Sequence, residues 1–139
     1  MGSMTPFLTL LLLGYAALST TATECTTNTP NFIQTSDIVT DIHSIATNSL
    51  NPPLSNPVDI EASQAKRIAF PTTTFCIQND YLYEKSLIKI SDITSGANAI
   101  VSQCCNGATC QGGSYTITGS LGVKVILTIQ PGGTSCVNL

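Results

Sequence analysis

Cysteines are the residues whose number and spacing most plainly imply chemistry in this chain. A zinc site would need close-spaced ligand pairs, usually completed by histidines, but the chain has one histidine, His43, and no Cys-x-x-Cys sequence. The missing Cys-x-x-Cys also argues against thioredoxin-like redox chemistry. An even number of cysteines in a small chain is typical of a disulfide framework. We therefore predict disulfides, and neither a metal nor another cofactor, at Cys25, Cys76, Cys104, Cys105, Cys110 and Cys136.

The pairing of these cysteines is open from the sequence, because six cysteines allow many connectivities. Cys104 and Cys105 are adjacent and are not expected to bond to each other, given the Cα separation that a disulfide needs. Their side chains leave a helix ~100° apart. We therefore expect them to tie the helix to two different parts of the fold. Cys110 is close enough in sequence to close a short loop with either of them.

The first and last cysteines flank the domain, so bridges from them would hold its two ends. A bond between Cys76 and Cys104 is disfavoured by the strand around Cys76. Phe75 and Ile77 are expected to face the core there, which turns Cys76 to the opposite side.

Side chains that could support catalysis are few. A catalytic triad would need His43 beside a nucleophilic serine and a carboxylate, but no Gly-x-Ser-x-Gly elbow occurs. A glycosidase would need paired acids, and Asp37, Asp41, Glu84 and Asp92 are the candidates. Asp37 and Asp92 are better explained as first-turn residues that suit the helix dipole. We therefore predict no catalytic residue and do not expect an enzyme.

The beginning of the chain is typical of a secretory signal peptide. Residues 8–18 form an apolar run that is too short to span a bilayer. Small residues follow it, and cleavage is expected between Ser19 and Glu24, although the usual basic residue before the run is missing. We assign residues 1–22 to the signal peptide and residues 23–139 to a single domain. The protein is expected to be secreted and extracellular.

Charge argues against a nucleic-acid partner. The net charge is −3, and only 9% of the residues are charged. The five cations are scattered apart from the Lys66-Arg67 pair, so no phosphate-binding surface is expected. No later apolar run is long enough for a transmembrane segment. The expected partner is a host or competitor protein or a cell-surface component, bound by a monomer.

Two segments that share the string Ser-Asp-Ile predict amphipathic helices. Residues 36–50 and residues 91–105 each place apolar side chains on one face at helical spacing. The first stripe contains Ile38, Ile42, Ile45 and Ala46, and the second contains Ile93, Ala97, Ile100 and Val101.

The expected N-caps of the two helices are Thr35 or Ser36 and, in the second, Ser91. Asn51-Pro52-Pro53 should stop the first helix, and Asn106-Gly107 should end the second. Gly96 is a poor helix former, at a cost of ~1 kcal/mol relative to alanine. Its presence inside the second helix suggests that a neighbouring element approaches closely there.

Strands are predicted in two places. Residues 66–79 hold two β-rich strings separated by Pro71, and residues 114–129 alternate apolar and polar side chains about a glycine-bounded loop. Residues 51–65 hold three prolines and are expected to form a loop, while residues 87–90 are ambiguous. The sequence thus predicts an α+β fold. In it, two helices pack on one face of a roughly four-stranded antiparallel sheet, stapled by disulfides.

With these features, the sequence resembles the killer-toxin-like and necrosis-inducing effector families of small secreted fungal proteins. The matching features are Thr74-Phe75-Cys76-Ile77, the helix from Ser91-Asp92-Ile93 to Cys104-Cys105, and the glycine-rich hairpin of residues 112–129. The likeness spans residues 72–136 and is one of spacings. It implies a two-helix α/β sandwich and a role in antagonising a host or a competing microbe. The adjacent cysteine pair departs from the pattern, so no disulfide pairing follows from it.

Two functional hypotheses remain. The first is a secreted toxin or virulence effector that binds a host or competitor target without catalysis. The second is a structural protein of a fungal cell wall or surface. Cys104-Cys105-Asn106 is similar to a hydrophobin cysteine doublet, but hydrophobins carry more cysteines and a second doublet, and this chain has six. A large exposed apolar patch with surface activity would favour the structural hypothesis.

Overall fold

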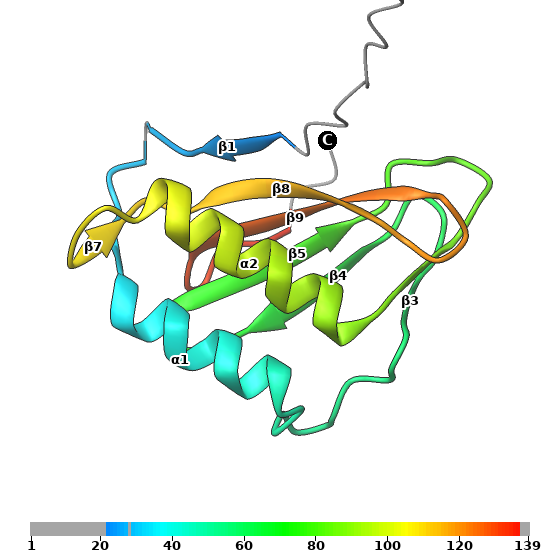
Figure 1. Cartoon of the computed structure of the whole chain (residues 1–139), viewed down its shortest axis with the longest axis horizontal. Helices are drawn as coiled ribbons and strands as arrows, with labels where there is room; N and C mark the ends of the chain where they lie inside the picture. The colour runs from blue at the N-terminus through cyan, green and yellow to red at the C-terminus, as the bar shows by residue number, and fades with distance from the viewer. Residues whose placement is uncertain (1–21, 28, 137–139) are drawn as a thin grey trace, which may run out of the picture.

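The structure is a computed structural model, and it describes residues 22–27 and 29–136 (Figure 1). The predicted signal peptide lies outside the described residues, except for Ala22. The elements in chain order are β1 (Thr23–Cys25), β2 (Ile33–Gln34), α1 (Thr35–Ala46), β3 (Val58–Ile60), β4 (Ala65–Ala69), β5 (Thr73–Gln78), β6 (Ser86–Ile88), α2 (Ile90–Cys104), β7 (Thr109–Cys110), β8 (Gly113–Thr118) and β9 (Lys124–Pro131).

The main sheet is antiparallel and has the strand order β1-β8-β9-β5-β4. Two hairpins, β4–β5 and β8–β9, are joined by the pairing of β5 with β9. These are the strand pairs that the sequence predicted. The fifth strand, β1, was not predicted, because three residues are too few to show a period of alternation. It pairs with β8 through Thr23–Cys25 and forms one edge of the sheet.

Both helices lie on one face of this sheet and pack against each other (Figure 1). Antiparallel register places Tyr115, Leu127 and Ile77 in one row across β8, β9 and β5, and Tyr115 and Leu127 contact α2. The core between helices and sheet is rich in isoleucine, and each such side chain contributes ~1.5–3 kcal/mol on burial. This arrangement confirms the predicted α+β fold. The fully buried side chains of the core include Ile38, Ile45, Phe75, Ile77, Ile93, Ile100, Leu127 and Ile129.

Gly96 is a point at which α2 approaches the sheet closely. A Cβ atom at this position would lie 2.8 Å from Cδ1 of Tyr115 and 3.3 Å from Cδ2 of Leu127. Only a residue without a side chain allows the helix to rest on these two side chains, whose dispersion contacts offset the low helix propensity of glycine. The close approach predicted at Gly96 is confirmed.

The predicted helix starts are wrong by one or two residues. Gln34 and Lys89 occupy the N-cap positions of α1 and α2, and neither makes a side-chain capping bond. Ser91 therefore lies inside its helix. The first backbone N–H group of each helix instead donates to a residue that is distant in the sequence. Thr35 N–H donates to Ala108 O at 2.8 Å, and Ile90 N–H donates to Oδ1 of Asn56 at 3.2 Å.

The first helix also ends earlier than predicted, at Ala46 rather than at residue 50. Asn48 adopts a φ of 50°, a left-handed conformation that asparagine tolerates better than most residues. Its side chain bonds both backbone groups of Leu54. Nδ2 of Asn48 donates to Leu54 O at 2.9 Å, and Oδ1 of Asn48 accepts from Leu54 N–H at 2.8 Å. These local side-chain bonds replace the backbone bonds of a further helical turn, and the helix ends here.

Two short strand pairs complete the fold. β2 pairs with β7, which joins the start of α1 to the segment after α2. β3 pairs with β6, where Val58 lies opposite Ile88 and Ile60 opposite Ser86. The prediction of a loop over residues 51–65 is therefore wrong at β3. Val58 and Ile60 are both buried, and their burial outweighs the weak local signal of a three-residue strand.

Candidate functional site

The six cysteines form three disulfides, and no described cysteine is free. The prediction of a disulfide-bonded chain is confirmed. Cys104 bonds to Cys25 in β1, whereas Cys105 bonds to Cys110 in β7. The two adjacent cysteines thus bond to different parts of the fold, one to the edge strand of the main sheet and one to the short strand that follows α2.

The third disulfide, Cys76–Cys136, lies on the sheet face that points away from the helices. Cys76 takes this side because Phe75 and Ile77 fill the core on the other. Residues 132–136 lie over this face as a consequence. Nε of Arg67 donates to Thr134 O at 3.2 Å, and Nε2 of Gln130 donates to Ser135 O at 3.1 Å. The disulfides are structural staples, so a functional surface must be sought elsewhere.

Large apolar side chains are exposed at one end of the sheet. Leu82 and Tyr83 are 69% and 91% exposed, and Leu121 is 56% exposed. The loop after β5 and the turn before β9 lie at the same end, since Gln78 pairs with Ile126. Both also adjoin β6, where Ser120 N–H donates to Leu87 O at 3.0 Å. We call this surface the apolar end and define it as Tyr81, Leu82, Tyr83 and Leu121.

The loop of the apolar end is held by the buried side chain of Asn79, which is 1% exposed. Oδ1 of Asn79 accepts from Tyr81 N–H at 3.1 Å, and Tyr81 O accepts from Ser63 N–H at 2.9 Å. This network fixes the loop backbone from inside. Nδ2 of Asn79 donates to three carbonyl oxygens, those of Ile60 at 3.2 Å, Glu61 at 3.3 Å and Glu84 at 2.8 Å.

A loop that is fixed from inside while its apolar side chains face water is typical of a binding surface. Burying a leucine or an aromatic side chain contributes ~1.5–3 kcal/mol, and Leu82 and Tyr83 gain little of this within the chain. Tyrosine also offers a large contact area together with a polar hydroxyl, and it is therefore common at interfaces. The apolar end is our candidate site for contact with a partner.

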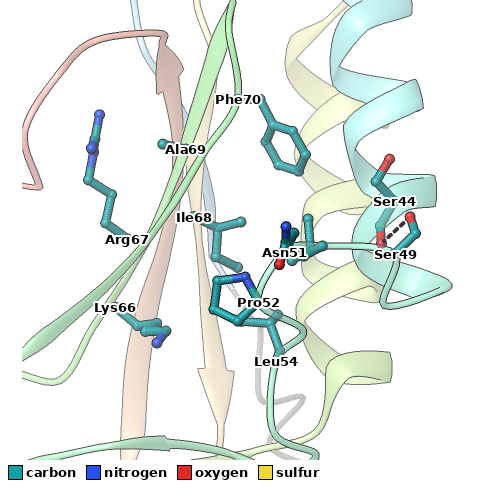
Figure 2. Close-up of a pocket in the computed structure, with 11 residues that line it drawn as sticks. Ser44, Ser49, Asn51, Pro52, Leu54, Lys66, Arg67, Ile68, Ala69 and Phe70 are labelled. Atoms are coloured by element: carbon teal, nitrogen blue, oxygen red, sulfur yellow. Dashed lines mark hydrogen bonds between the residues drawn. The ribbon is translucent and has the colours of Figure 1, made fainter.

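A groove of about 380 Å³ lies between β4, the end of α1 and the segment that follows it (Figure 2). Figure 2 shows Ile68 and Phe70 on the side of β4 that faces α1, and Arg67 on the other side. Lys66 and Arg67 are the cations that line the groove, and no acidic residue lines it. Its apolar lining consists of Leu50, Pro52, Leu54, Ile68, Ala69 and Phe70.

The predicted acidic residues do not converge on one site. Asp37 and Asp92 lie in the first turns of α1 and α2, as predicted. Asp41 is one turn from Asp37 on α1, but Glu84 lies in the loop between β5 and β6. His43 is exposed on α1. Within residues 22–27 and 29–136, histidine, cysteine and acidic side chains form no cluster that could hold a metal ion.

Asp41 is a carboxylate in the core, where it joins α1 to β5. Its Oδ2 accepts a hydrogen bond from the Thr73 hydroxyl. Burial raises the pKa of Asp41 above the ordinary value of 3.8, the bond from Thr73 opposes this rise, and the negative charge of Asp37 adds to it. Because the ionised form is disfavoured in the folded state, Asp41 links the stability of the fold to pH.

We expect Asp41→Asn to change this pH dependence. The folded pKa is raised, so the stabilising contribution of protonated Asp41 is fully present below pH 3.8, the ordinary value, and is lost as pH rises through the folded pKa. Asparagine keeps an acceptor for Thr73 and carries no charge. The free energy of unfolding of Asp41→Asn minus that of the parent should therefore grow as the pH rises from 3 to 7, as measured by urea unfolding. A difference that does not vary with pH would contradict the role of Asp41.

No described helix is long and apolar enough to cross a membrane. In comparisons with known proteins, the chain matches no protein-family model, no curated protein and no solved structure. Its function must therefore be inferred from its own residues.

Proposed function

We propose that the chain is a secreted, disulfide-stapled toxin or virulence effector that binds a target of a host or competing microbe without catalysis. The observation that carries this proposal is the apolar end, whose Leu82 and Tyr83 face water from a loop that Asn79 fixes. A preorganised loop loses little entropy on binding, so more of its contact energy appears as affinity.

Two further observations support secretion, and a third supports the effector role. Three disulfides join all six cysteines, and such bonds persist in oxidising compartments outside the cytosol. The apolar run of residues 8–18 is typical of a secretory leader. The resemblance in spacings to the killer-toxin-like and necrosis-inducing effector families points to the same role.

Replacing Leu82 and Tyr83 together by serine should raise the dose needed for half-maximal effect at least about tenfold. Anchor side chains at interfaces contribute ~1 kcal/mol or more each, and 1.4 kcal/mol corresponds to a factor of ten. The measurement is a dose–response curve of the purified secreted protein, scored as necrosis in infiltrated leaves and as growth inhibition of competitor yeasts and bacteria. An unchanged curve in every responding assay would overturn the proposal.

Two control variants test whether the loss of activity is specific to the apolar end. Val39→Ser removes another exposed apolar side chain, on α1, and should leave the curve unchanged. His43→Ala removes the imidazole and should also leave activity intact. If His43→Ala abolishes activity while circular dichroism and secretion are unchanged, the protein does not act by binding alone.

The same apolar end favours a second candidate, a structural protein of a fungal wall or surface. Assembly at an interface between water and an apolar phase would bury Leu82, Tyr83 and Leu121. This candidate predicts a lowered surface tension and self-association in sedimentation experiments, both lost in the Leu82/Tyr83 double variant. The effector proposal predicts a monomer without surface activity.

A further inference from the structure

A backbone hydrogen bond lies just beyond each end of the β4–β5 ladder, and the two bonds show which residues of β4 bond to β5. Phe70 N–H donates to Thr73 O at 2.9 Å, and Asn79 N–H donates to Gln64 O at 2.9 Å. Hydrogen-bonded pairs alternate with non-bonded pairs along an antiparallel ladder. The even-numbered residues of this stretch therefore direct their N–H and C=O groups toward β5.

The odd-numbered residues of β4 direct their backbone groups the opposite way, out of the sheet. β4 is an edge strand, and no described strand pairs with this side of it. Such an edge is a template for another strand. The outward-directed N–H and C=O groups belong to Ala65, Arg67 and Ala69.

The groove of Figure 2 adjoins this open edge, because five consecutive residues, Lys66 to Phe70, line it. Ile68 and Phe70 lie on the helix side of β4 (Figure 2), and Leu50 and Leu54 line the same groove. A strand added at the edge would direct alternate side chains into this apolar groove. The intervening side chains would lie on the opposite face, beside Arg67.

The groove is electrostatically positive. Lys66 and Arg67 are its charged lining residues, and both are exposed. Neither forms an ion pair with a described residue, since the ion pair among those residues joins Lys85 to Asp59. Arg67 uses its Nε–H on Thr134 O, which leaves the terminal N–H groups of its guanidinium for a ligand. Because neighbouring side chains of a strand alternate between its faces, Arg67 is the cation that would complement a carboxylate on the face away from the helices.

We propose that this groove binds an extended peptide, which adds to the open edge of β4 as a sixth strand. Its residues alternate between apolar side chains, which fill the groove beside Ile68, and acidic side chains, which face Arg67. The added backbone bonds supply affinity, and the alternating pockets supply specificity. This binding site goes beyond the proposed function, because it shares no residue with the apolar end.

A second copy of the chain is a poor occupant for this edge. Antiparallel pairing of two β4 strands would bring Lys66 and Arg67 of one copy close to the same cations of the other. Like charges that face each other across strands are destabilising. An acidic peptide has the complementary charge.

The test uses the whole secreted protein and blocked peptides of alternating glutamate and valine, titrated by calorimetry. We expect saturable binding that is at least about tenfold weaker for the matched lysine–valine peptide, since charge complementarity sets the choice of partner. Hydrogen exchange should show new protection at the amides of Ala65, Arg67 and Ala69. N-methylation of the peptide backbone should abolish binding.

Arg67→Glu should weaken binding of the acidic peptide at least about tenfold, because the acidic side chains of the peptide face Arg67. Lys124→Glu is the matched control, because Lys124 is exposed on β9 outside the groove, and it should bind as the parent does. Absence of binding, equal binding of both peptides, or concentration-dependent protection of β4 without peptide would each overturn the proposal. These readouts do not involve leaf or growth assays, so this proposal and the proposed function can fail separately.

Discussion

Replacing Cys25 and Cys104 together by alanine should lower the free energy of unfolding by about 4–5 kcal/mol, whereas replacing Cys105 and Cys110 should lower it by about 2 kcal/mol. The reason is the length of chain that each bond closes. Cys25 and Cys104 are separated by 79 positions, and Cys105 and Cys110 by 5. A longer closed loop removes more entropy from the unfolded chain, so its loss destabilises the fold more.

Urea unfolding of the two double variants measures this difference, and the yield of secreted protein provides a second readout. The matched control is the double variant of Cys76 and Cys136, which are separated by 60 positions. It should fall close to the Cys25/Cys104 variant, with a loss of about 4 kcal/mol. Because domains of this size have total stabilities of ~5–15 kcal/mol, both long-range variants should be secreted poorly. Equal losses in all three variants would contradict the dependence on loop length.

Single substitutions in the cysteine doublet give a sharper test of the pairing. Cys104→Ser should leave Cys25 with a free thiol, and Cys105→Ser should leave Cys110 with one. Mapping of unreduced peptides reads out both thiols. The same free thiol in both variants would show that the two positions exchange partners.

The elements that could be predicted from the sequence are those whose side chains repeat. Isoleucines at helical spacing identified α1 and α2, and alternation about the glycines after Thr118 identified the β8–β9 hairpin. Pro71 correctly separated β4 from β5. For the helices and the β8–β9 hairpin, a local period of three or more turns or alternations carries the signal. For β4 and β5, the signal is a β-rich composition interrupted by a proline.

The short strands could not be predicted, because their cause is not local. β1 has three residues and is placed by the disulfide from Cys25 and by pairing with β8. β3 is placed by the burial of Val58 and Ile60 against residues far along the chain. The N-cap of α2 was missed for the same reason, since the helix begins at Ile90, whose N–H donates to Oδ1 of Asn56, a residue far away in the sequence.

Neither candidate site was predicted from the sequence. The Lys66-Arg67 pair is visible there, but two cations are too small a cluster to indicate nucleic acid. The groove also needs Leu50 and Leu54, which approach β4 only in the folded chain. The one local signal of the apolar end is Tyr81-Leu82-Tyr83, three large apolar residues between Asp80 and Glu84 with neither helical nor alternating spacing. Large apolar residues with an acidic residue directly on either side could have drawn attention to an exposed loop.

Asn79→Ala should lower the free energy of unfolding by about 3 kcal/mol, although it removes only one small side chain. Asn79 is buried and satisfies three backbone carbonyl oxygens and one backbone N–H group. A buried polar group left without a partner costs about 1–3 kcal/mol, and water entering the loosened loop would recover part of the total. Urea unfolding measures the loss. Asn98→Ala, at an exposed position on α2, is the matched control and should change stability by less than about 0.5 kcal/mol.

Asn79→Asp separates the donor role of this side chain from its acceptor role. Aspartate still accepts from Tyr81 N–H but cannot donate to the carbonyl oxygens of Ile60, Glu61 and Glu84, and it places a negative charge beside them. We therefore expect Asn79→Asp to be at least as destabilising as Asn79→Ala. If aspartate retains most of the stability, the bond to Tyr81 is the one that holds the loop, and the three carbonyl contacts contribute little.

The Asn79 variants also connect the stability of the loop to the proposed function. In Asn79→Ala, Leu82 and Tyr83 are still present, but the loop that carries them must become ordered when the target binds. Ordering segments on binding lowers affinity, so activity in leaf or growth assays should fall several-fold while the folded protein remains secreted. Hydrogen exchange at the Tyr81 amide should rise in the same variant. Full activity despite rapid exchange at Tyr81 would show that the target does not need a preorganised loop, and the apolar end would then lose its main support as the binding surface.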